Sequence, residues 1–372
     1  MTRRADVAVV GGGMLGLAHA YLAAARGQSV VLFERGVRAT GASIRNFGMI
    51  WPIGQPPGEM HEVALRSRAL WLEMLKRTGL PYRPTGSLHV AYRDDERDVL
   101  AEFAELAPGL GYDCELLTPA GVSRRSAAVR AEGLVAGLWS ATELTIDPRA
   151  IVAALPGVLR SMGVEVRTGC PVVGIDLPTV ETPEGQWTVD RAIVCSGDEF
   201  ATLYPDVFAA SGLTRCKLQM MRTAPQANGW DLGPALAAGL TLRFYKAFRD
   251  CTTLPALRAR IAREMPEYDR WGIHTLVSQT ADGAITLGDS HEYGESPEIF
   301  DRTEIDQLIL DNIKTYLALP DDRIVERWHG VYAWHPELSV VRCQPAPGVQ
   351  IVTGVGGSGM TLSFGLAERT LT

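Results

Sequence analysis

Three glycines at a fixed spacing near the N-terminus constrain the fold more than any other feature. Gly11, Gly13 and Gly16 follow the apolar run ADVAVV (5–10) and precede the alanine-rich LAHAYLAAARG. The apolar run suits a buried parallel strand, and an alanine-rich stretch that ends in glycine suits a helix. A second apolar run, SVVLFE (29–34), completes the pattern of a β-α-β unit.

This unit predicts dinucleotide binding. Gly11 permits a tight turn, Gly13 lets a pyrophosphate approach the backbone at the helix N-terminus, and Gly16 lets helix and strand pack closely. Glu34 ends the second strand, where a carboxylate accepts from a ribose 2′-hydroxyl and disfavours a 2′-phosphate. The spacing therefore favours NAD or FAD over NADP.

The composition excludes several classes of function. The 372 residues are 46% hydrophobic and 21% charged with a net charge of −7, which argues against a general nucleic-acid surface. The chain has no apolar run long enough for a membrane span and starts without a secretory pattern, so we expect a cytoplasmic protein. Its six cysteines lack C-x-x-C spacing and its seven histidines lack H-x-x-x-H spacing, so we expect reduced thiols and no metal site.

A second glycine run near the other end separates NAD from FAD. GVGGSG (354–359) follows the apolar VQIVT and matches the same glycine spacing. Too few residues follow Gly359 for another complete nucleotide unit, so the run predicts a loop and helix N-terminus directed at the far part of the first cofactor. A long cofactor held from both ends of the chain favours FAD. The alternative is a plain glycine turn before a final helix.

The sequence resembles the D-amino-acid oxidase, glycine oxidase and sarcosine oxidase family of FAD-dependent oxidoreductases. The resemblance rests on DVAVVGGGMLGLAHAYLAAARGQSVVLFER, on GVGGSGMTLSFGLAE and on the hairpin-like TLVSQTADGAITLGDS, and it spans essentially the whole chain. It implies that the apolar loop GASIRNFGMIWPIGQP (41–56) runs under the flavin ring. It also implies non-covalent FAD, because Gly330 stands where some relatives carry a flavin-linked cysteine.

The motifs and the resemblance together give the predicted cofactor site. Its residues are Gly11, Gly13, Met14, Gly16, Glu34, Arg35, Ala42, Ser43, Arg45, Asn46, Phe47, Gly48, Met49, Val172, Val173, Ser196, Gly197, Gly330, Gly356, Gly357, Ser358, Gly359, Met360 and Thr361.

The expected fold is α/β, with a Rossmann-type (GR2-like) FAD-binding domain interleaved with an α+β substrate domain on a mixed or antiparallel sheet. The first domain takes residues 1–80, 147–212 and 325–372, and the second takes 81–146 and 213–324. Helices are expected over 59–79, 147–163, 255–268 and 304–317. β segments are expected at CKLQMMRT, LTLRFYK and HTLVSQTADGAITLGDS.

The substrate end departs from the family pattern. Relatives that oxidise α-amino acids hold the carboxylate with an arginine where this chain has Tyr332, and sarcosine oxidases carry a lysine where it has Thr361. An arginine–carboxylate fork is hard to replace with a phenol. The candidate catalytic residues are Arg45, Asn46, Lys217, His274, His291 and Tyr332, with Gln55, Gln219, Arg243, Tyr245 and His335 as further donors.

The segment ASIRNFGMIWPIGQPPG also resembles a subgroup associated with phosphonate breakdown. It implies a small, anionic amine substrate, best an aminophosphonate or its N-methylated form, oxidised to aldehyde, amine and H2O2 with molecular oxygen as acceptor. The alternatives are an amino-acid oxidase of the glycine, sarcosine or D-amino-acid type, an FAD dehydrogenase with another acceptor, and a non-enzymatic flavin protein. His274 could serve only its hairpin, Arg243 and Lys246 could lie on a solvated strand face, and Lys217 could face solvent.

Overall fold

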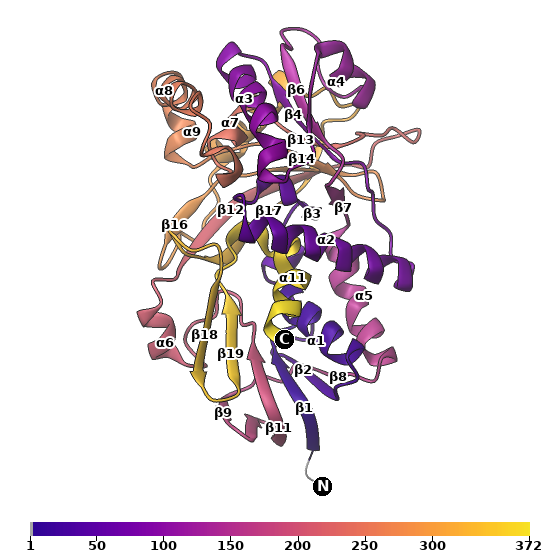
Figure 1. Cartoon of the computed structure of the whole chain (residues 1–372), viewed down its shortest axis with the longest axis vertical. Coiled ribbons are helices and arrows are strands. Elements are labelled where there is room, and N and C mark those ends of the chain that lie inside the picture. Colours follow the sequence, from indigo (N-terminus) through magenta and orange to yellow (C-terminus); the bar gives the residue numbers. More distant parts are fainter. Residues whose placement is uncertain (1–2) are drawn as a thin grey trace.

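The chain is built around two large β-sheets, which lie in the lower and upper parts of Figure 1. The computed structural model describes residues 3–372. The strands of the first sheet are β1 (Arg3–Val10), β2 (Val30–Glu34), β8 (Glu165–Thr168), β9 (Gly174–Asp176), β10 (Thr179–Thr182), β11 (Gly185–Val194), β18 (Val341–Ala346) and β19 (Val349–Thr353). Their central order is β18-β19-β11-β1-β2-β8, with β10 joined to β11 and β9 to β10.

The centre of the first sheet is parallel, as the N-terminal motif predicts. β1 pairs in parallel with both β2 and β11, β2 with β8, and β11 with β19. Helices α1 (Met14–Ala25), α2 (Glu59–Thr78), α5 (Pro148–Ser161) and α11 (Gly359–Leu371) bury their apolar residues in one cluster with strands β1, β2 and β11. In Figure 1 the yellow α11 lies beside α1 and below α2, and it packs against both.

The second sheet is mostly antiparallel. Its strands are β4 (Ser87–Ala91), β5 (Glu115–Leu117), β6 (Ala136–Ser140), β12 (Thr214–Thr223), β13 (Ala235–Ala237), β14 (Leu276–Gln279), β15 (Ile285–Gly288), β16 (Glu292–Gly294) and β17 (Ile324–Trp334). They follow the order β16-β12-β15-β14-β13-β4-β6-β5, with β17 paired to β12. The expected α/β fold with a second mixed sheet is confirmed.

Shorter elements complete the chain. A small sheet joins β3 (Met49–Ile50) to β7 (Leu144–Thr145). The remaining helices are α3 (Asp94–Leu110), α4 (Pro119–Arg125), α6 (Pro205–Ala210), α7 (Gly239–Leu242), α8 (Leu254–Glu264), α9 (Pro266–Arg270) and α10 (Thr303–Tyr316). Within residues 3–372, no helix is both long and apolar enough to cross a membrane.

Local signals explain several element boundaries. Asp147 caps α5 by accepting the backbone N–H groups of Arg149 and Ala150, and Pro148 occupies the first helical position. Gly79 ends α2 in the left-handed conformation. The hairpin predicted around residues 274–290 is formed by β14 and β15, which pair antiparallel.

One element prediction is wrong. The stretch LTLRFYK (240–246) was expected to be a β segment, but its first residues belong to the single helical turn α7. The alternation of apolar and polar residues is satisfied here by a turn that buries Leu240 and Leu242. This turn brings Arg243 and the two residues after it to the cavity described below.

The two sheets take their strands from alternating stretches of the chain. The division into two interleaved domains stays a proposal, and β17 changes one of its boundaries. This strand pairs with β12 from Thr214↔Trp334 to Thr223↔Ile324, so it belongs to the second sheet. We therefore place the return to the first domain after Trp334 rather than at residue 325.

Candidate active site

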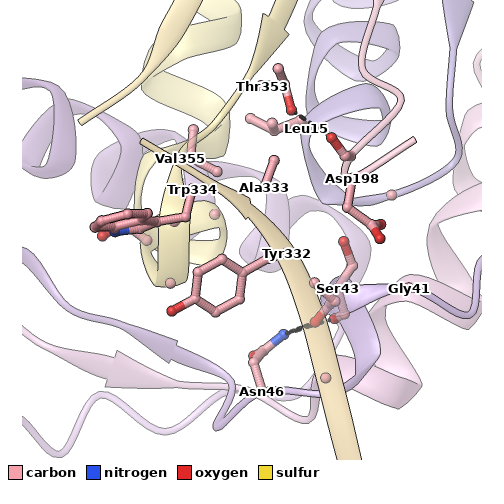
Figure 2. A pocket seen from close by; sticks show the side chains of 18 of the residues that line it. Leu15, Gly41, Ser43, Asn46, Asp198, Tyr332, Ala333, Trp334, Thr353 and Val355 are labelled. Atoms are coloured by element: carbon pink, nitrogen blue, oxygen red, sulfur yellow. Dashed lines mark hydrogen bonds between the residues drawn. The ribbon is translucent and has the colours of Figure 1, made fainter. Parts of the chain in front are cut away.

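A cavity of about 610 Å³ opens where the carboxyl ends of β1 and β2 approach β12 and β17. Its size is within the usual range for cofactor and ligand sites. Side chains of Tyr332 and Asn46 are among those that line it (Figure 2). The carboxyl edge of a parallel sheet is the general location of ligands in such folds.

The glycine motif has the geometry that the sequence predicts. Gly11 has φ +107°, and a Cβ added to it would lie 2.2 Å from the carbonyl oxygen of Cys195. A Cβ at Gly16 would lie 1.9 Å from the Gly11 oxygen, so this glycine acts through packing and does not line the cavity. Gly13 precedes α1 and provides no side-chain cap. The Ser43 hydroxyl accepts the first N–H of the helix, that of Met14, at 2.8 Å. The N-terminus of α1 lines the cavity and its dipole attracts anions.

Glu34 is fixed by the turn that follows β1. Its Oε2 accepts the backbone N–H of Gly12 at 2.8 Å, and its Oε1 accepts that of Gly36 at 2.8 Å. The carboxylate lines the cavity. Each oxygen still has acceptor capacity, which suits the hydroxyls of a ribose.

Residues 41–56 form a folded wall rather than a solvent loop. Asn46 organises it: its amide donates to the carbonyls of Ala42 and Ser43, and its Oδ1 accepts the N–H of Gly48. The bond to Ser43 is visible in Figure 2. Arg45 donates to the carbonyl of His329 on β17. Both polar side chains thus have structural partners, and Asn46 has no amide hydrogen left for a substrate.

The apolar residues of this wall pack on the second sheet. Phe47, Met49 and Trp51 are buried in one cluster with Leu218 and Tyr332, among others. Figure 2 shows the Tyr332 ring projecting from β17 among the lining residues. The wall therefore excludes water from one side of the cavity.

The glycine loop near the other end of the chain closes the cavity. Residues Gly354 to Thr361 line it, and α11 begins at Gly359 without a side-chain cap. Thr361, which stands where relatives carry lysine, uses its hydroxyl to accept the backbone N–H of Trp51 at 2.9 Å. Two helix N-termini, those of α1 and α11, thus meet at one cavity.

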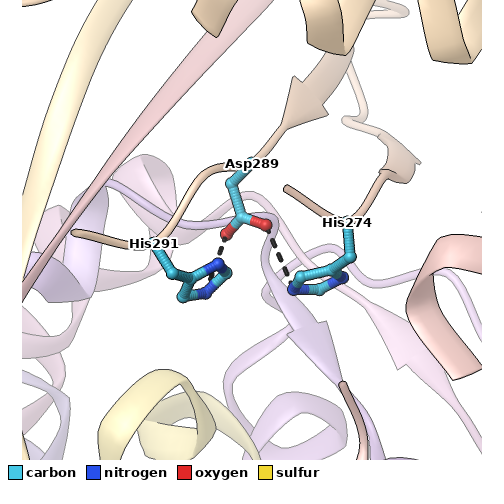
Figure 3. A group of neighbouring side chains, drawn as sticks. All are labelled: His274, Asp289 and His291. Carbon is cyan, nitrogen blue, oxygen red and sulfur yellow. Dashed lines mark ion pairs between the residues drawn. The ribbon is translucent and has the colours of Figure 1, made fainter. Parts of the chain in front are cut away.

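A buried group of ionisable side chains lies beside β14 and β15 of the second sheet (Figure 3), whereas Glu34 ends β2 of the first sheet. Asp289 stands between two histidines, with Oδ1 3.3 Å from His274 Nε2 and Oδ2 3.9 Å from His291 Nε2. All three side chains line the cavity. The Phe244 ring covers both imidazoles at centroid distances of 3.9 and 4.4 Å.

Burial dominates the protonation of this group. It raises the pKa of Asp289 well above its ordinary value and lowers the pKa of His291 to about 4. Burial also lowers the pKa of His274 well below its ordinary value, and the neighbouring His291 and Arg243 add to this effect. Near neutral pH both rings are therefore uncharged. Burial favours the protonated form of Asp289 in the empty cavity, and a cationic ligand favours its carboxylate.

Arg243 supplies positive charge beside these histidines. Its Nη2 donates to the carbonyls of Tyr268 and Ile273 and lies 3.3 Å from an Asp269 oxygen. Its Nε is buried without a hydrogen-bond partner among the described residues. The side chain lines the cavity, so this arginine is not on a solvated strand face.

Lys217 is not brought to this site. Its Nζ donates to the carbonyl of Phe300 at 2.6 Å and pairs with Asp301 at 3.1 Å. Because side chains alternate along β12, Lys217 lies on the other face from Leu218 and Met220, which line the cavity. Its predicted role at the substrate is therefore wrong.

Most other predicted residues line the cavity. Of the cofactor set these are Gly11, Gly13, Met14, Glu34, Arg35, Ala42, Ser43, Arg45, Asn46, Phe47, Met49, Val172, Ser196, Gly197, Gly330, Gly356, Gly357, Ser358, Gly359, Met360 and Thr361. Three do not. Gly16 is discussed above, Val173 is 52% exposed at the surface, and Gly48 serves a turn whose space is limited by the carbonyl of Ile146.

Two residues of the site were missed by sequence reasoning. Asp289 is two positions before His291, so in an extended segment both side chains lie on one side, and this spacing could have pointed to it. Phe244 gave no such signal, because its position depends on the helical turn α7.

Comparison with known proteins agrees with this cavity. The family model described as "DAO: FAD dependent oxidoreductase" matches residues 6–371. The chain belongs to this family. Its cofactor is FAD, and the cavity fits that group: the N-termini of α1 and α11 suit a pyrophosphate, and the carboxylate of Glu34 suits a ribose.

The curated relatives match over part of their length. Human mitochondrial sarcosine dehydrogenase is 27% identical over 52% of this chain and 22% of that protein. Glycine oxidase of Geobacillus kaustophilus (strain HTA426) is 27% identical over 53% of this chain and 55% of that protein. The matched segments thus cover about a fifth and about half of these two relatives.

Solved structures share the fold over nearly the whole chain. Glycine oxidase from Bacillus cereus ATCC 14579 has a TM-score of 0.78 at 17% identity, covering 98% of this chain and 93% of that one. L-alpha-glycerophosphate oxidase from Mycoplasma pneumoniae with FAD bound has a TM-score of 0.78 at 19% identity, covering 100% and 94%. At these identities the likeness concerns the fold.

Proposed function

We propose that this chain oxidises a small amine that also carries an anionic group, with an N-methylated or primary aminophosphonate as the preferred substrate. Bound FAD would accept a hydride from the carbon beside the amine nitrogen. With molecular oxygen as acceptor, amine, oxygen and water give an aldehyde, the released amine and H2O2. The relatives named above for sarcosine and glycine support an amine as the substrate class.

The observation that carries the proposal is that Arg243 and Asp289 both line the cavity beside the same two histidines. Arg243 provides a buried donor without a partner, and Asp289 provides a buried acceptor without one. The two side chains flank the same histidines. A zwitterion with its amine and its anion a short distance apart satisfies both groups.

Phosphonate fits this part of the cavity better than carboxylate for two reasons. The positions where relatives hold a carboxylate carry Tyr332 and Thr361, and the Thr361 hydroxyl is already engaged with Trp51. Arg243 has one partly satisfied guanidinium rather than a free fork, and the unpartnered Nδ1 of His274 belongs to a ring next to it. A phosphonate has three oxygens and can accept from several such donors at once.

We assign the cofactor as follows. The α1 N-terminus at Gly13 and the glycine loop before α11 hold the pyrophosphate, and Glu34 holds the adenosine ribose. The wall at residues 45–49 and the strand residues Leu218 and Gly330 enclose the flavin ring. The chain's own tasks are to orient the amine, to exclude water and to hold protons.

Anaerobic bleaching of the flavin tests the proposal. Glycine, sarcosine, D-alanine, aminoethylphosphonate and N-methylaminoethylphosphonate would each be added to the purified holoprotein without oxygen. We expect the phosphonates to bleach the flavin with the highest bimolecular rate constants, by about a hundredfold if each unpaired buried donor costs roughly 1–3 kcal/mol. Equal or faster bleaching by glycine or sarcosine would instead establish an amino-acid oxidase.

A separate measurement identifies the electron acceptor. Once a bleaching amine is known, oxygen uptake and H2O2 formation should match the amine consumed one to one. Turnover that needs an artificial acceptor and leaves oxygen untouched would make the chain a dehydrogenase, as the name of the human relative describes for that protein.

A further inference from the structure

We infer that Asp289, held between His274 and His291, binds the substrate's ammonium group and takes its proton, so that the amine is neutral when it is oxidised. This inference rests on the proposed function and adds a proton acceptor to it. In the transfer, one N–H bond of the ammonium breaks, its electron pair stays on nitrogen, and an O–H bond forms on the Asp289 carboxylate. Oxidation needs this step because only a neutral nitrogen has an electron pair to release toward the carbon.

The tautomer of His291 follows from the hydrogen bond made by its Nδ1 atom. Its Nδ1 lies 3.0 Å from the carbonyl oxygen of Gly272. A carbonyl only accepts, so Nδ1 carries the hydrogen and the neutral ring presents a lone pair at Nε2. That lone pair faces Asp289 Oδ2 at 3.9 Å. When Asp289 is ionised both atoms are acceptors, so a donor placed between them satisfies both.

Within the described part of the chain, the other oxygen of Asp289 also has no hydrogen-bond donor. Asp289 Oδ1 and His274 Nδ1 are both buried without a hydrogen-bond partner among residues 3–372. Backbone bonds in both directions between His274 and Asp289 fix the two residues relative to each other. In Figure 3 the carboxyl group points into the gap between the two rings. An amine with two N–H groups can donate to Asp289 and His291 together.

The direction of the proton transfer follows from burial. Asp289 is 5% exposed and His291 is 6% exposed, and Phe244 covers both rings. A dry site disfavours an ammonium and a carboxylate alike. Moving the proton from nitrogen to oxygen removes both charges at once, so the neutral pair is the preferred state inside the closed cavity.

Other ionisable groups also face this site. Arg243 is the cation beside both histidines. The other groups close enough to sense Asp289 are Cys216, Tyr245, Tyr293 and Tyr332. Burial raises the pKa of each of these four groups, so they stay neutral near pH 7 and none competes as a proton acceptor.

A bound metal ion is the rival use of the same atoms. The donor atoms of His274, Asp289 and His291 lie within 4.8 Å of one another. Arg243 next to the rings opposes a second positive charge. One equivalent of a divalent metal in the purified holoprotein, lost together with activity on chelation, would overturn the proton-acceptor role.

The main test is the pH profile of Asp289→Asn, because asparagine keeps the shape but takes no proton. In the parent protein, kcat/KM for N-methylaminoethylphosphonate should rise as Asp289 ionises and fall as the free amine loses its proton. In Asp289→Asn it should be about a hundredfold lower near pH 7 and rise about tenfold per pH unit toward the pKa of the amine. Asp306→Asn is the matched control, since Asp306 is also a buried carboxyl group and lies outside the cavity.

Binding gives a readout that is independent of turnover. Perturbation of the flavin absorbance would compare aminoethylphosphonate with ethylphosphonate, which lacks the amine. The parent protein should prefer the amine at least tenfold, and Asp289→Asn should lose this preference while binding ethylphosphonate as before. Bleaching in both proteins with unchanged pH profiles and unchanged preference would overturn the inference alone. Failure of every amine to bind or bleach the parent protein would overturn the proposed function, and this inference with it.

Discussion

Glu34 Oε2 accepts the backbone N–H of Gly12 at 2.8 Å and thereby joins the end of the second strand to the glycine turn after the first. The same carboxylate lines the cavity. One side chain thus shapes the turn and faces the space that we assign to the ribose. The cost of removing it should appear in cofactor affinity.

Glu34→Ala should weaken FAD binding by roughly 1–3 kcal/mol, the usual cost of leaving buried donors without a partner. Turnover at saturating FAD should change little, because Glu34 ends β2 of the first sheet whereas Asp289 follows β15 of the second. Titration of apoprotein with FAD, followed by fluorescence quenching, measures the difference. Glu165→Ala in the neighbouring strand is the control, since Glu165 is exposed and does not line the cavity. Lower turnover with unchanged FAD affinity would show that Glu34 is misassigned.

FAD should be released completely on denaturation. Gly330 stands at the position of the flavin-linked cysteine in some relatives, and a Cβ there would already lie 3.3 Å from the carbonyl oxygen of Arg45 and from Leu218 Cδ1. A larger side chain has no free space to reach the ring. Acid precipitation should therefore leave all yellow colour in the supernatant, and colour retained by the pellet would contradict non-covalent binding.

Arg243→Met should raise KM for a phosphonate amine about tenfold to a hundredfold with a smaller change in kcat, because a charge-assisted hydrogen bond contributes roughly 1.5–3 kcal/mol. FAD affinity should stay the same. Arg222→Met is a suitable control, since Arg222 is also a buried arginine but pairs with Asp282 outside the cavity. Steady-state kinetics on both variants measure these changes in KM and kcat. An equal effect of the two substitutions would indicate a general loss of stability rather than lost anion binding.

The contribution of Glu143 to the free energy of unfolding should decrease as the pH rises. Its carboxyl group is fully buried and accepts from Ile53 N–H and the Ser87 hydroxyl. Burial raises its pKa above the ordinary 4.5, so the folded state binds the proton more tightly than the unfolded state. That stabilisation is complete at low pH and is lost as the pH rises through the folded-state pKa.

Glu143→Gln removes this titration with little change in shape. Its melting temperature should therefore fall less than that of the parent protein between about pH 5 and about pH 8. Glu165→Gln, at an exposed position, should follow the parent curve. Parallel curves for the parent protein and Glu143→Gln would mean that Glu143 does not titrate differently in the two states.

Local patterns predicted the nucleotide half of the molecule well, for a physical reason. Gly11, Gly13 and Gly16 act through backbone conformation and close packing, which depend on residues nearby in sequence. The capping role of Asp147 is local in the same way. Such features are readable without knowledge of the tertiary fold.

The substrate end depends on long-range contacts and was predicted less well. Lys217 alternates with apolar residues on β12. Only its contacts with residues 300 and 301 show that it lies on the face away from the cavity. Asp289 is unremarkable in sequence until the hairpin places it between two histidines. The sequence predicts a strand around Arg243, because a single helical turn and a short strand can both bury alternate apolar residues.

Helix α11 has a consequence for how the protein is made. Residues 354–361 complete a cavity that is also lined by Val10, Gly11, Gly13, Met14 and Leu15. During synthesis on the ribosome, the nucleotide turn emerges long before the loop that encloses its ligand. Flavin captured early would lack the contacts of residues 354–361, so secure loading must wait until that loop has emerged.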